Sequence, residues 1–171
     1  MAGLVLAGVA GCGALATTPS HDRTAPVDFS ADRMELQDKA KRVVLTGNVD
    51  ITQAELRLTA DRTLMAYTDG DKLTLQRIDA TGRVVVTRSN ERASGDIAVY
   101  DLTRKLITMV GHVALRRANG DVLNGGRLVI NLDTGISTID GHSAGPPAPG
   151  AAGGGRVSGT FNAPRKDANQ R

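Results

Sequence analysis

Three aspartates at equivalent places in a repeated pattern are the side chains best suited to chemistry. Asp32, Asp61 and Asp96 each follow a small residue and stand at the head of an apolar run. Two carboxylates close together can act as a general acid and a general base. A residue that returns once per repeat is more typical of a structural corner, where Asp accepts hydrogen bonds from nearby backbone. We therefore interpret these aspartates as corner residues and predict no catalytic residue.

The other reactive side chains do not form a site by their spacing. His21, His112 and His142 are far apart in the sequence, and Cys12 is the only cysteine. A structural zinc site needs about four Cys or His ligands in a compact pattern. No Ser/His/Asp set forms a recognisable nucleophile elbow, and the chain has no G-x-x-x-x-G-K-[ST] loop for nucleotide phosphates. The sequence predicts a protein that is not an enzyme and that uses no metal or cofactor.

The charge distribution and the aromatic content argue against a nucleic-acid-binding domain. The net charge is +3, but all of this excess follows residue 142, and residues 17–142 are neutral overall. Duplex binding needs Lys and Arg on the folded part of a protein, and single-strand binding uses several stacked aromatic rings. The chain has two Phe, two Tyr and no Trp. We expect no nucleic-acid partner.

The elements that position these residues are predicted to be strands. Between residues 27 and 141, apolar and polar residues alternate with a period of two, and several runs are rich in β-branched residues. Asp-Gly and Asn-Gly turn signals separate the runs at short intervals. Residues 31–41 could hold a helix, although a strand followed by a polar turn fits them as well. The clearest strands are residues 43–51, 56–60, 84–86, 97–100, 106–110 and 128–132.

A Gly-x-Val motif recurs along these strands and marks a repeat of about 30 residues. It begins at Gly47, Gly82 and Gly111. Glycine permits a bulge or a positive φ where a strand bends. One such unit cannot bury its own apolar stripe, so successive units must stack. The predicted fold class is all-β, with repeated antiparallel strands that form a partly open two-sheet sandwich of the β-jellyroll or β-taco type, solenoid-like in its repetition.

An aliphatic stripe is expected to face the inside of this sandwich. In an arbitrary all-β protein such a stripe is a closed core, whereas in a carrier it would line a trough for an apolar ligand. The residue pattern alone leaves both possibilities open. The candidate lining residues are Leu45, Val49, Ile51, Leu56, Leu58, Leu64, Ile78, Val84, Val86, Ile97, Val99, Leu106, Val110, Val113, Leu115, Leu128 and Ile130.

Residues 1–16 are predicted to be an export signal. They are uncharged and apolar, they end in an A-x-A cleavage site at Ala14-Leu15-Ala16, and they are too short to span a bilayer. Residues 17–26 would follow as an extended segment. The preceding Val9-Ala10-Gly11-Cys12 also resembles a bacterial lipobox, in which Cys12 would be lipidated. Cleavage after Ala16 is the favoured interpretation, and either route places the mature protein outside the cytoplasm.

The β-domain is expected to span residues 27–142 and to be followed by a tail. Residues 143–155 consist almost entirely of Gly, Pro and Ala. This composition cannot hold a strand ladder or a core. We expect residues 143–171 to form a Gly/Pro-rich, disordered and basic tail.

The order of the motifs resembles the LptA (OstA-like) family of lipopolysaccharide transport proteins. The resemblance rests on Ala31-Asp32, Gly47-Asn48-Val49, Leu58-Thr59-Ala60-Asp61 and Gly111-His112-Val113, and it covers residues 26–141. It implies a periplasmic protein of a Gram-negative bacterium that binds the lipid A portion of lipopolysaccharide. It also implies head-to-tail self-association, an LptC-like inner-membrane partner and an LptD-like outer-membrane partner.

The resemblance gives the aliphatic stripe a function. Each methylene group removed from water contributes about 0.8 kcal/mol, so a lipid with several acyl chains cannot cross an aqueous compartment freely. We expect the chain to hold acyl chains in its trough and to pass them from the inner-membrane export complex to the outer-membrane translocon. An exported structural β-solenoid scaffold and, through Cys12, a lipid-anchored envelope assembly factor are the alternatives.

Overall fold

The computed structural model describes residues 25–70, 72–142 and 155–162, and the predicted export signal with Cys12 lies outside them. The described residues form ten strands and one 3-10 turn. In chain order these are β1 (Asp28–Ser30), β2 (Arg33–Gln37), η1 (Asp38–Ala40), β3 (Arg42–Gln53), β4 (Leu56–Asp69), β5 (Leu73–Arg88), β6 (Glu91–Asp101), β7 (Leu106–Arg117), β8 (Val122–Asn131), β9 (Ser137–Asp140) and β10 (Ser158–Thr160).

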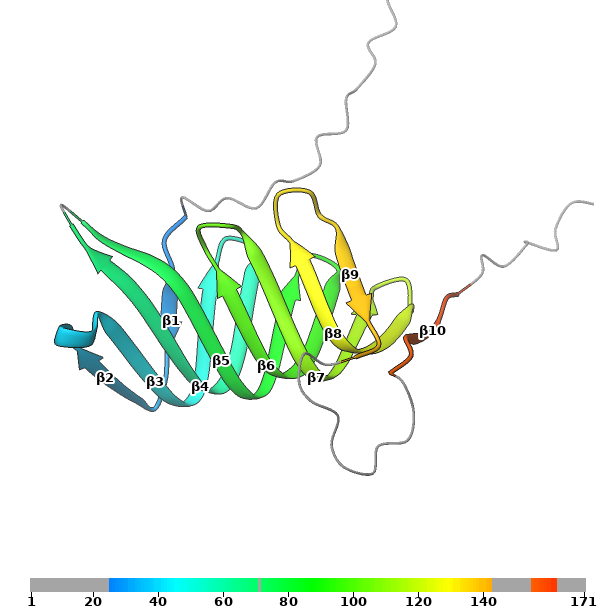
Figure 1. The fold of residues 1–171 in the computed structure, drawn as a ribbon, viewed down its shortest axis with the longest axis horizontal. Coiled ribbons are helices and arrows are strands. Elements are labelled where there is room, and N and C mark those ends of the chain that lie inside the picture. The colour runs from blue at the N-terminus through cyan, green and yellow to red at the C-terminus, as the bar shows by residue number, and fades with distance from the viewer. Residues whose placement is uncertain (1–24, 71, 143–154, 163–171) are drawn as a thin grey trace, which may run out of the picture.

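All ten strands belong to one antiparallel sheet (Figure 1). The long strands β3 to β8 follow one another in sequence order, and each pairs with its neighbours. At one end of the sheet, β1 and β2 both pair with β3, at different places along its length. At the other end, β10 and β9 divide β8 between them in the same way. The all-β, antiparallel prediction is confirmed, and the sheet formed by the described residues stays open. The 31–41 region is a strand and a polar turn.

The long strands bend where the Gly-x-Val motifs lie. Gly47, Gly82 and Gly111 have φ values of 80°, 78° and 79°, in the left-handed region that favours glycine. The pairing register shifts at each of these places, because β3, β5 and β7 each carry an extra residue there. Such bulges bend a strand and increase its twist. The bends line up across the sheet and form what we call the corner line.

The corner line divides the sheet into two walls that face each other. We call the half that contains β1 and β10 the first wall, and the half that contains β2 and β9 the second wall. Buried side chains from both walls form one hydrophobic cluster. The hairpin turns lie along the outer edges of the walls, on either side of an opening that we call the mouth. The predicted two-sheet sandwich is therefore a single sheet folded along the corner line.

The recurring aspartates lie on the corner line. The Asp32 carboxylate accepts a hydrogen bond from Asn48 Nδ2 at 3.0 Å, and Asp61 Oδ1 accepts one from Arg83 Nε at 2.9 Å. In the third pair, His112 Nδ1 lies 2.7 Å from Asp96 Oδ2.

Each of these carboxylates lies over the glycine that precedes its partner, in the space that a Cβ would occupy. Their assignment as corner residues agrees with this geometry. The hydrogen bonds, however, join side chains of neighbouring strands rather than the Asp side chain and local backbone.

Five of the predicted interior residues do not face the interior. Leu64, Ile97, Val99, Leu106 and Val110 are partly or largely exposed, and Ile97 is 41% exposed. Their sequence neighbours occupy the buried positions instead: Met65, Ala98, Tyr100, Ile107 and Met109.

In β4 and β6, the alternation of inward and outward side chains shifts by one residue at the aspartate corner. This change of phase explains why Leu64, Ile97 and Val99 were wrongly predicted to face the interior. In β4 the buried positions are even-numbered up to Ala60 and odd-numbered from Thr63 onward. In β6, Ala93 is buried before the corner, and Ala98 and Tyr100 are buried after it. In β7, which crosses the corner line through Gly111 and its extra residue, the phase is kept. The five residues were predicted to be inside because the alternation was assumed to continue through the aspartate corners and to change in β7.

The tail differs from the expectation in its second half. Residues 143–154 and 163–171 lie outside the described residues. Ser158–Thr160, which were expected to be disordered, form β10 and pair with Val122–Asn124 of β8. The composition did not reveal this strand, because a three-residue strand with a central glycine has no clear pattern of its own.

Candidate functional site

Continuous rows of mostly apolar side chains line the space between the walls. The rows run across the strands, because each inward residue pairs with an inward residue of the next strand. In the second wall, one row is fully buried and consists of Leu45, Thr63, Ala80, Ala98, Met109 and Leu128. In the first wall, Ile51, Leu58, Val86, Ala93 and Leu115 are at most 3% exposed.

Most of the predicted lining residues belong to this interior. The structure buries Leu45, Val49, Ile51, Leu56, Leu58, Ile78, Val84, Val86, Val113, Leu115, Leu128 and Ile130. They come from both walls, so the fold brings residues that are far apart in sequence to one apolar space.

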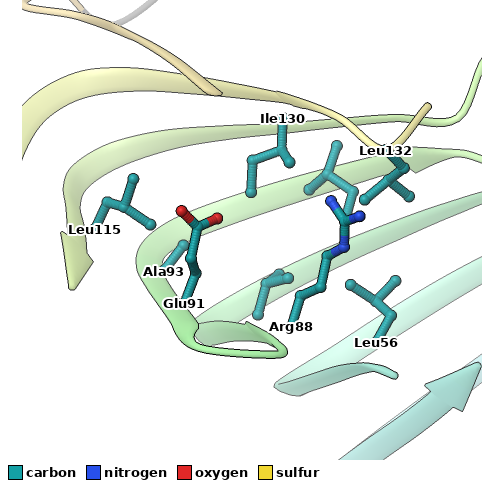
Figure 2. Close-up of a pocket in the computed structure, with 9 residues that line it drawn as sticks. Leu56, Arg88, Glu91, Ala93, Leu115, Ile130 and Leu132 are labelled. Carbon is teal, nitrogen blue, oxygen red and sulfur yellow. The ribbon is translucent and has the colours of Figure 1, made fainter. Parts of the chain in front are cut away.

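Little free space remains between the walls at the mouth beside the strands from β4 to β8. A cavity at the mouth, lined by Leu56, Ile107, Leu115 and other side chains of the two walls, has a volume of about 10 Å³. This is close to the smallest space that can hold one water molecule. Figure 2 shows the apolar side chains around it, with Arg88 and Glu91 extending beside them from the β5–β6 hairpin. In this part of the molecule the walls are in contact.

The β1/β2 end of the interior is open. A cavity of about 550 Å³ lies there, and Phe29, Val43, Met65, Tyr67 and Leu75 are among its lining residues. Its volume is within the range of about 300–1,000 Å³ that is typical of small-molecule sites, and such sites are mostly apolar. The interior therefore has a large apolar space at one end of the sheet and only a small one beside the strands from β4 to β8.

A buried hydrogen bond joins the two walls. The Tyr100 hydroxyl, on the second wall, donates to Gln53 Oε1, on the first wall, at 3.0 Å. Gln53 Nε2 in turn donates to the carbonyl oxygen of Ala25 at 3.2 Å. Burial, with a smaller contribution from the negative charge of Glu55, raises the pKa of Tyr100 to about 12. At neutral pH the hydroxyl therefore keeps the proton that it donates across the mouth.

Ion pairs link neighbouring hairpins along the edge of the first wall. Arg88 Nε lies 3.4 Å from Glu55 Oε1, and Arg117 Nε lies 2.8 Å from Glu91 Oε1. The Arg88 side chain is only 16% exposed. These pairs hold the hairpins of one wall together and place polar groups beside the apolar mouth.

The polar contacts between the walls were not predicted from the sequence. Tyr100 lies in a predicted strand. It points inward only because the alternation in β6 shifts by one residue at the corner, and this shift was not predicted. Gln53 is a single polar residue at the end of β3 and gives no sequence signal for burial. Thr63 is also fully buried, and its hydroxyl makes no hydrogen bond within the described part of the chain. These three residues place polar atoms in an interior that was expected to be aliphatic.

The described residues show neither a metal-ligand cluster nor a membrane-spanning helix. No group of three or more His, Cys, Asp or Glu side chains among them is placed to hold a metal ion. Within the same residues, no helix is long and apolar enough to cross a membrane.

A family profile matches most of the described chain. The profile is that of the LptA/(LptD N-terminal domain) LPS transport proteins, and it covers residues 28–136. These residues extend from β1 to the turn before β9. The match thus includes the corner line, both walls and the buried rows.

One curated relative and one solved structure are also similar to this chain. An uncharacterised protein of Rhizobium meliloti is 24% identical over 121 residues, which are 67% of this chain and 65% of that protein. The crystal structure of LptH from Pseudomonas aeruginosa, described as the LptA-homologous periplasmic component of the lipopolysaccharide transport device, superimposes with a TM-score of 0.71. It is 20% identical in sequence, and the superposition covers 85% of this chain and 100% of LptH. The structural similarity confirms the fold.

Proposed function

The chain belongs to the LptA/LptD N-terminal domain family of lipopolysaccharide transport proteins, and we propose that it is a non-enzymatic periplasmic carrier that holds the acyl chains of lipid A between its two walls. The proposal rests on one observation above all, which is the apolar cavity of about 550 Å³ at the β1/β2 end. This cavity leads into rows of buried aliphatic side chains that run the length of the sheet.

The physical basis of the proposal is the transfer of acyl chains out of water. Each methylene group contributes about 0.8 kcal/mol when it is buried, and the interior rows offer apolar side chains for this contact. The backbone groups of the walls pair within the sheet, so the walls do not present many unsatisfied polar groups to a lipid. The sugar head groups would remain in water at the mouth, where Arg88, Glu91 and Arg117 provide a polar border.

Binding beyond the open end requires the walls to part. In the middle of the interior the side chains touch, and the bond between Tyr100 and Gln53 joins the walls. We expect acyl chains to enter at the β1/β2 end and to separate the walls progressively. Because the interior consists of aliphatic and Met side chains with few rings, it can repack around a chain at low cost.

The partners of this carrier follow from the same proposal. We expect it to receive lipopolysaccharide from an LptC-like inner-membrane protein and to deliver it to an LptD-like outer-membrane protein. Both ends of the sheet carry short strands that pair on one side only among the described residues. Exposed strand edges readily accept further strands, which supports head-to-tail association of the chain with itself and with these partners.

Photo-crosslinking tests the proposal directly. The photoreactive amino acid benzoylphenylalanine replaces Tyr67, which is 7% exposed and lines the open cavity, or its neighbour Thr68, which points to solvent. We expect the variant at position 67 to crosslink to lipopolysaccharide in cells and the variant at position 68 to crosslink much less. Equal crosslinking at the two positions, or none at position 67, would contradict the proposal.

A structural scaffold is the second candidate, and the close packing in the middle of the interior favours it. A scaffold would keep its walls closed and would not take up lipid. A further benzoylphenylalanine at Val84, a buried residue near the corner line, separates the two candidates. Crosslinks to lipopolysaccharide from position 84 support a carrier whose walls part. Their absence at both positions 67 and 84 supports a scaffold.

A further inference from the structure

Two arginines lie directly opposite each other on the outer face of the first wall. Arg92 of β6 pairs with Arg116 of β7 in the strand register. Their sequence neighbours Ala93 and Leu115 are buried in the interior, each at 1% exposure, and successive side chains of a strand point to opposite faces. Both arginine side chains therefore point outward, and both are exposed.

No carboxylate balances these two charges within the described part of the chain. Neither guanidinium has a hydrogen bond or an ion pair with a described residue. Arg57, in the same outward row across the sheet, does have an acidic partner, because its Nε lies 2.9 Å from Asp50 Oδ1. Like charges directly opposite one another destabilise a sheet, so the unpaired arginines lower the stability of the fold.

The two carboxylates next to this pair in the sequence of the strands are already engaged. Glu91 accepts a hydrogen bond from Arg117 Nε at 2.8 Å. Asp121, which is 5% exposed, accepts one from Asn119 Nδ2 at 2.8 Å and one from the Asn162 backbone N–H at 2.9 Å. Both acids therefore leave the two outward arginines without a counter-charge.

A surface cavity of about 300 Å³ contains the arginine pair. Its lining also includes Thr87, Ser89 and Asn90, from the end of β5 and the turn that follows it. Their hydroxyl and amide groups are hydrogen-bond donors. The backbone carbonyl oxygen of Asn90 accepts a hydrogen bond from the Ala118 N–H at 2.9 Å, which ties the β5–β6 hairpin to the end of β7. The cavity thus combines two free guanidinium groups with neutral donors on a fixed frame.

The cavity extends over the edge of the first wall that borders the mouth, which we call the rim. Glu91 and Arg117 lie on the inward side of the strands that carry the outward arginines, and they also line this cavity. Glu91 lines the small cavity at the mouth as well, and Figure 2 shows it there beside Ala93 and Leu115. The two cavities therefore lie on the two sides of one hairpin. A ligand with apolar chains between the walls reaches the arginines by crossing the rim alone.

We propose that Arg92 and Arg116 form an anion site on the rim of the first wall, and that its ligand is a phosphate group on the head of the lipid whose acyl chains lie between the walls. Guanidinium groups bind phosphate oxygens through pairs of parallel N–H donors. A phosphate monoester carries a charge of about −1.5 to −2 at pH 7, which matches two arginines. A carboxylate carries a single charge and would leave one arginine uncompensated.

The opposite edge of the mouth differs in the turns that face this site. In the β6–β7 turn, Arg104 lies 3.8 Å from Asp101, and Lys105 pairs with Asp133 of the turn after β8. These cations already have acidic partners. The free positive charge at this part of the mouth is therefore on the first-wall side.

The inference rests on the proposed function, because it names a head-group contact for the same lipid. It adds two statements to that function. The carrier prefers phosphorylated head groups, and the phosphate lies over the rim of the first wall.

Binding to two forms of lipopolysaccharide tests the site. Intact and phosphatase-treated lipopolysaccharide have the same acyl chains and differ in their phosphate groups. The test variant is Arg92→Gln/Arg116→Gln. The matched control, Arg62→Gln/Arg104→Gln, also removes two positive charges, from exposed residues of β4 and of the β6–β7 turn that do not line the cavity. Surface plasmon resonance with the purified full chains measures the affinities.

We expect the test variant to bind intact lipopolysaccharide at least about tenfold more weakly than the wild type, because charge-assisted hydrogen bonds are lost. The control should stay within about twofold, because its charges are screened from the site by salt. The wild type and the test variant should bind the phosphatase-treated form equally. Equal affinities of the test variant and the wild type for the intact form would overturn the proposal. So would a loss that persists after dephosphorylation.

Inorganic phosphate distinguishes a lipid head group from free phosphate as the ligand. At constant ionic strength, an excess of inorganic phosphate should weaken the binding of intact lipopolysaccharide to the wild type and leave the test variant unaffected. An unchanged wild-type affinity would count against a phosphate site. Phosphate-31 NMR with inorganic phosphate completes the comparison. Arginine-dependent binding of inorganic phosphate without any preference for intact lipopolysaccharide would assign the site to free phosphate and overturn the head-group assignment.

A second variant shows whether charge is what the site supplies. Arg92→Lys/Arg116→Lys keeps both positive charges and loses the planar fork of donors. We expect its affinity for intact lipopolysaccharide to lie between those of the wild type and the Gln variant. An affinity no higher than that of the Gln variant would contradict the proposal. Thermal melting checks the fold, and the Gln variant should melt at or above the wild-type temperature because the repulsion between the two arginines is removed.

Crosslinking from position 67 keeps this inference separate from the proposed function. Tyr67 lines the open cavity at the β1/β2 end and does not line the arginine cavity. Crosslinks from position 67 to both forms of lipopolysaccharide, with equal affinities of all variants, would refute the arginine site and leave the carrier function intact. The absence of crosslinks and of binding for both forms would refute the carrier function itself.

Discussion

At the residue scale, the corner line depends on glycines whose Cβ positions are occupied. Gly82 has a φ of 78°, and an added Cβ would lie 2.9 Å from the Asp61 Cβ. The Asp61 carboxylate, which accepts hydrogen bonds from Arg83, has a pKa below its usual 3.8 for that reason. The bend is thus fixed jointly by backbone conformation and by a charged side chain that closes over it.

Gly82→Val is expected to destabilise the fold by about 2–4 kcal/mol, because a β-branched residue at positive φ is strained and also collides with Asp61. Gly70→Ala is the matched control, since nothing lies within 4 Å of its Cβ position and its φ is not in the left-handed region; its effect should stay within about 0.5 kcal/mol. Urea denaturation followed by circular dichroism measures both. Similar midpoints for the two variants would show that the corner does not require glycine.

The Tyr100 hydroxyl should make stability depend on alkaline pH. Its pKa is about 12 in the folded chain against 10 for a free tyrosine, so the folded state holds the proton more tightly. The resulting stabilisation is fully present below pH 10 and is lost as the pH rises from 10 to 12. Two pKa units correspond to about 2–3 kcal/mol. We expect the unfolding free energy of Tyr100→Phe to fall less over this interval than that of the wild type, as measured by denaturant titrations at each pH. An equal decline would exclude Tyr100 as the source.

At the element scale, the phase of each strand decides which residues reach the interior. Strands β4 and β6 change phase where they cross the corner line at an aspartate, and β7 does not. Met65 therefore lies in the interior at 5% exposure, while Leu64 lies on the outer face. Inward and outward side chains alternate regularly within each wall. In β4 and β6 this alternation does not continue unchanged from one wall to the other.

The pair Met65→Lys and Leu64→Lys tests this phase. A lysine at position 65 would place a charge in the apolar interior, and we expect a loss of at least about 3 kcal/mol or a failure to fold. A lysine at position 64 extends into solvent and should cost about 1 kcal/mol or less. Thermal melting of the two variants gives the comparison. The reverse order of stability would show that the strand has the opposite phase.

At the scale of the whole molecule, the sheet is an open structure with two different ends. One end exposes large apolar residues at the ends of buried rows, and the other ends in β9 and in a strand supplied by the tail. In the proposed head-to-tail association, a contact between unlike ends builds an open chain when no rotation closes it into a ring. Such a chain would extend the apolar interior from one copy to the next, as the proposed carrier function requires.

Met34→Asp is expected to weaken this association while leaving the monomer folded. Met34 is 55% exposed in the single copy, so the change should cost less than about 1 kcal/mol of stability. In a head-to-tail contact through β2, the new carboxylate would be buried, and we expect at least a tenfold weaker association. Ile97→Asp is the control, because Ile97 is 41% exposed on the outer face, away from both ends. Light scattering across a concentration series measures both variants, and equal association would contradict the predicted contact.

The sequence by itself determined the strands, the corners and the class of the fold. Alternating residues set the strands because successive side chains of a strand point to opposite faces. The glycines and aspartates marked the bends because these residues tolerate the required backbone. The order of these motifs was also sufficient to indicate the family.

Only the tertiary structure decided which face of each strand is inside beyond a bend, and what covers the edges. Leu64 and Ile97 are as apolar as the residues that are buried, and their exposure follows from the phase change at the corners. Gln53 and Tyr100 are 47 residues apart and meet only because the walls face each other. The short segment Ser158–Thr160 becomes a strand because β8 offers it a free edge. Such facts depend on contacts between distant parts of the chain, which no local pattern contains.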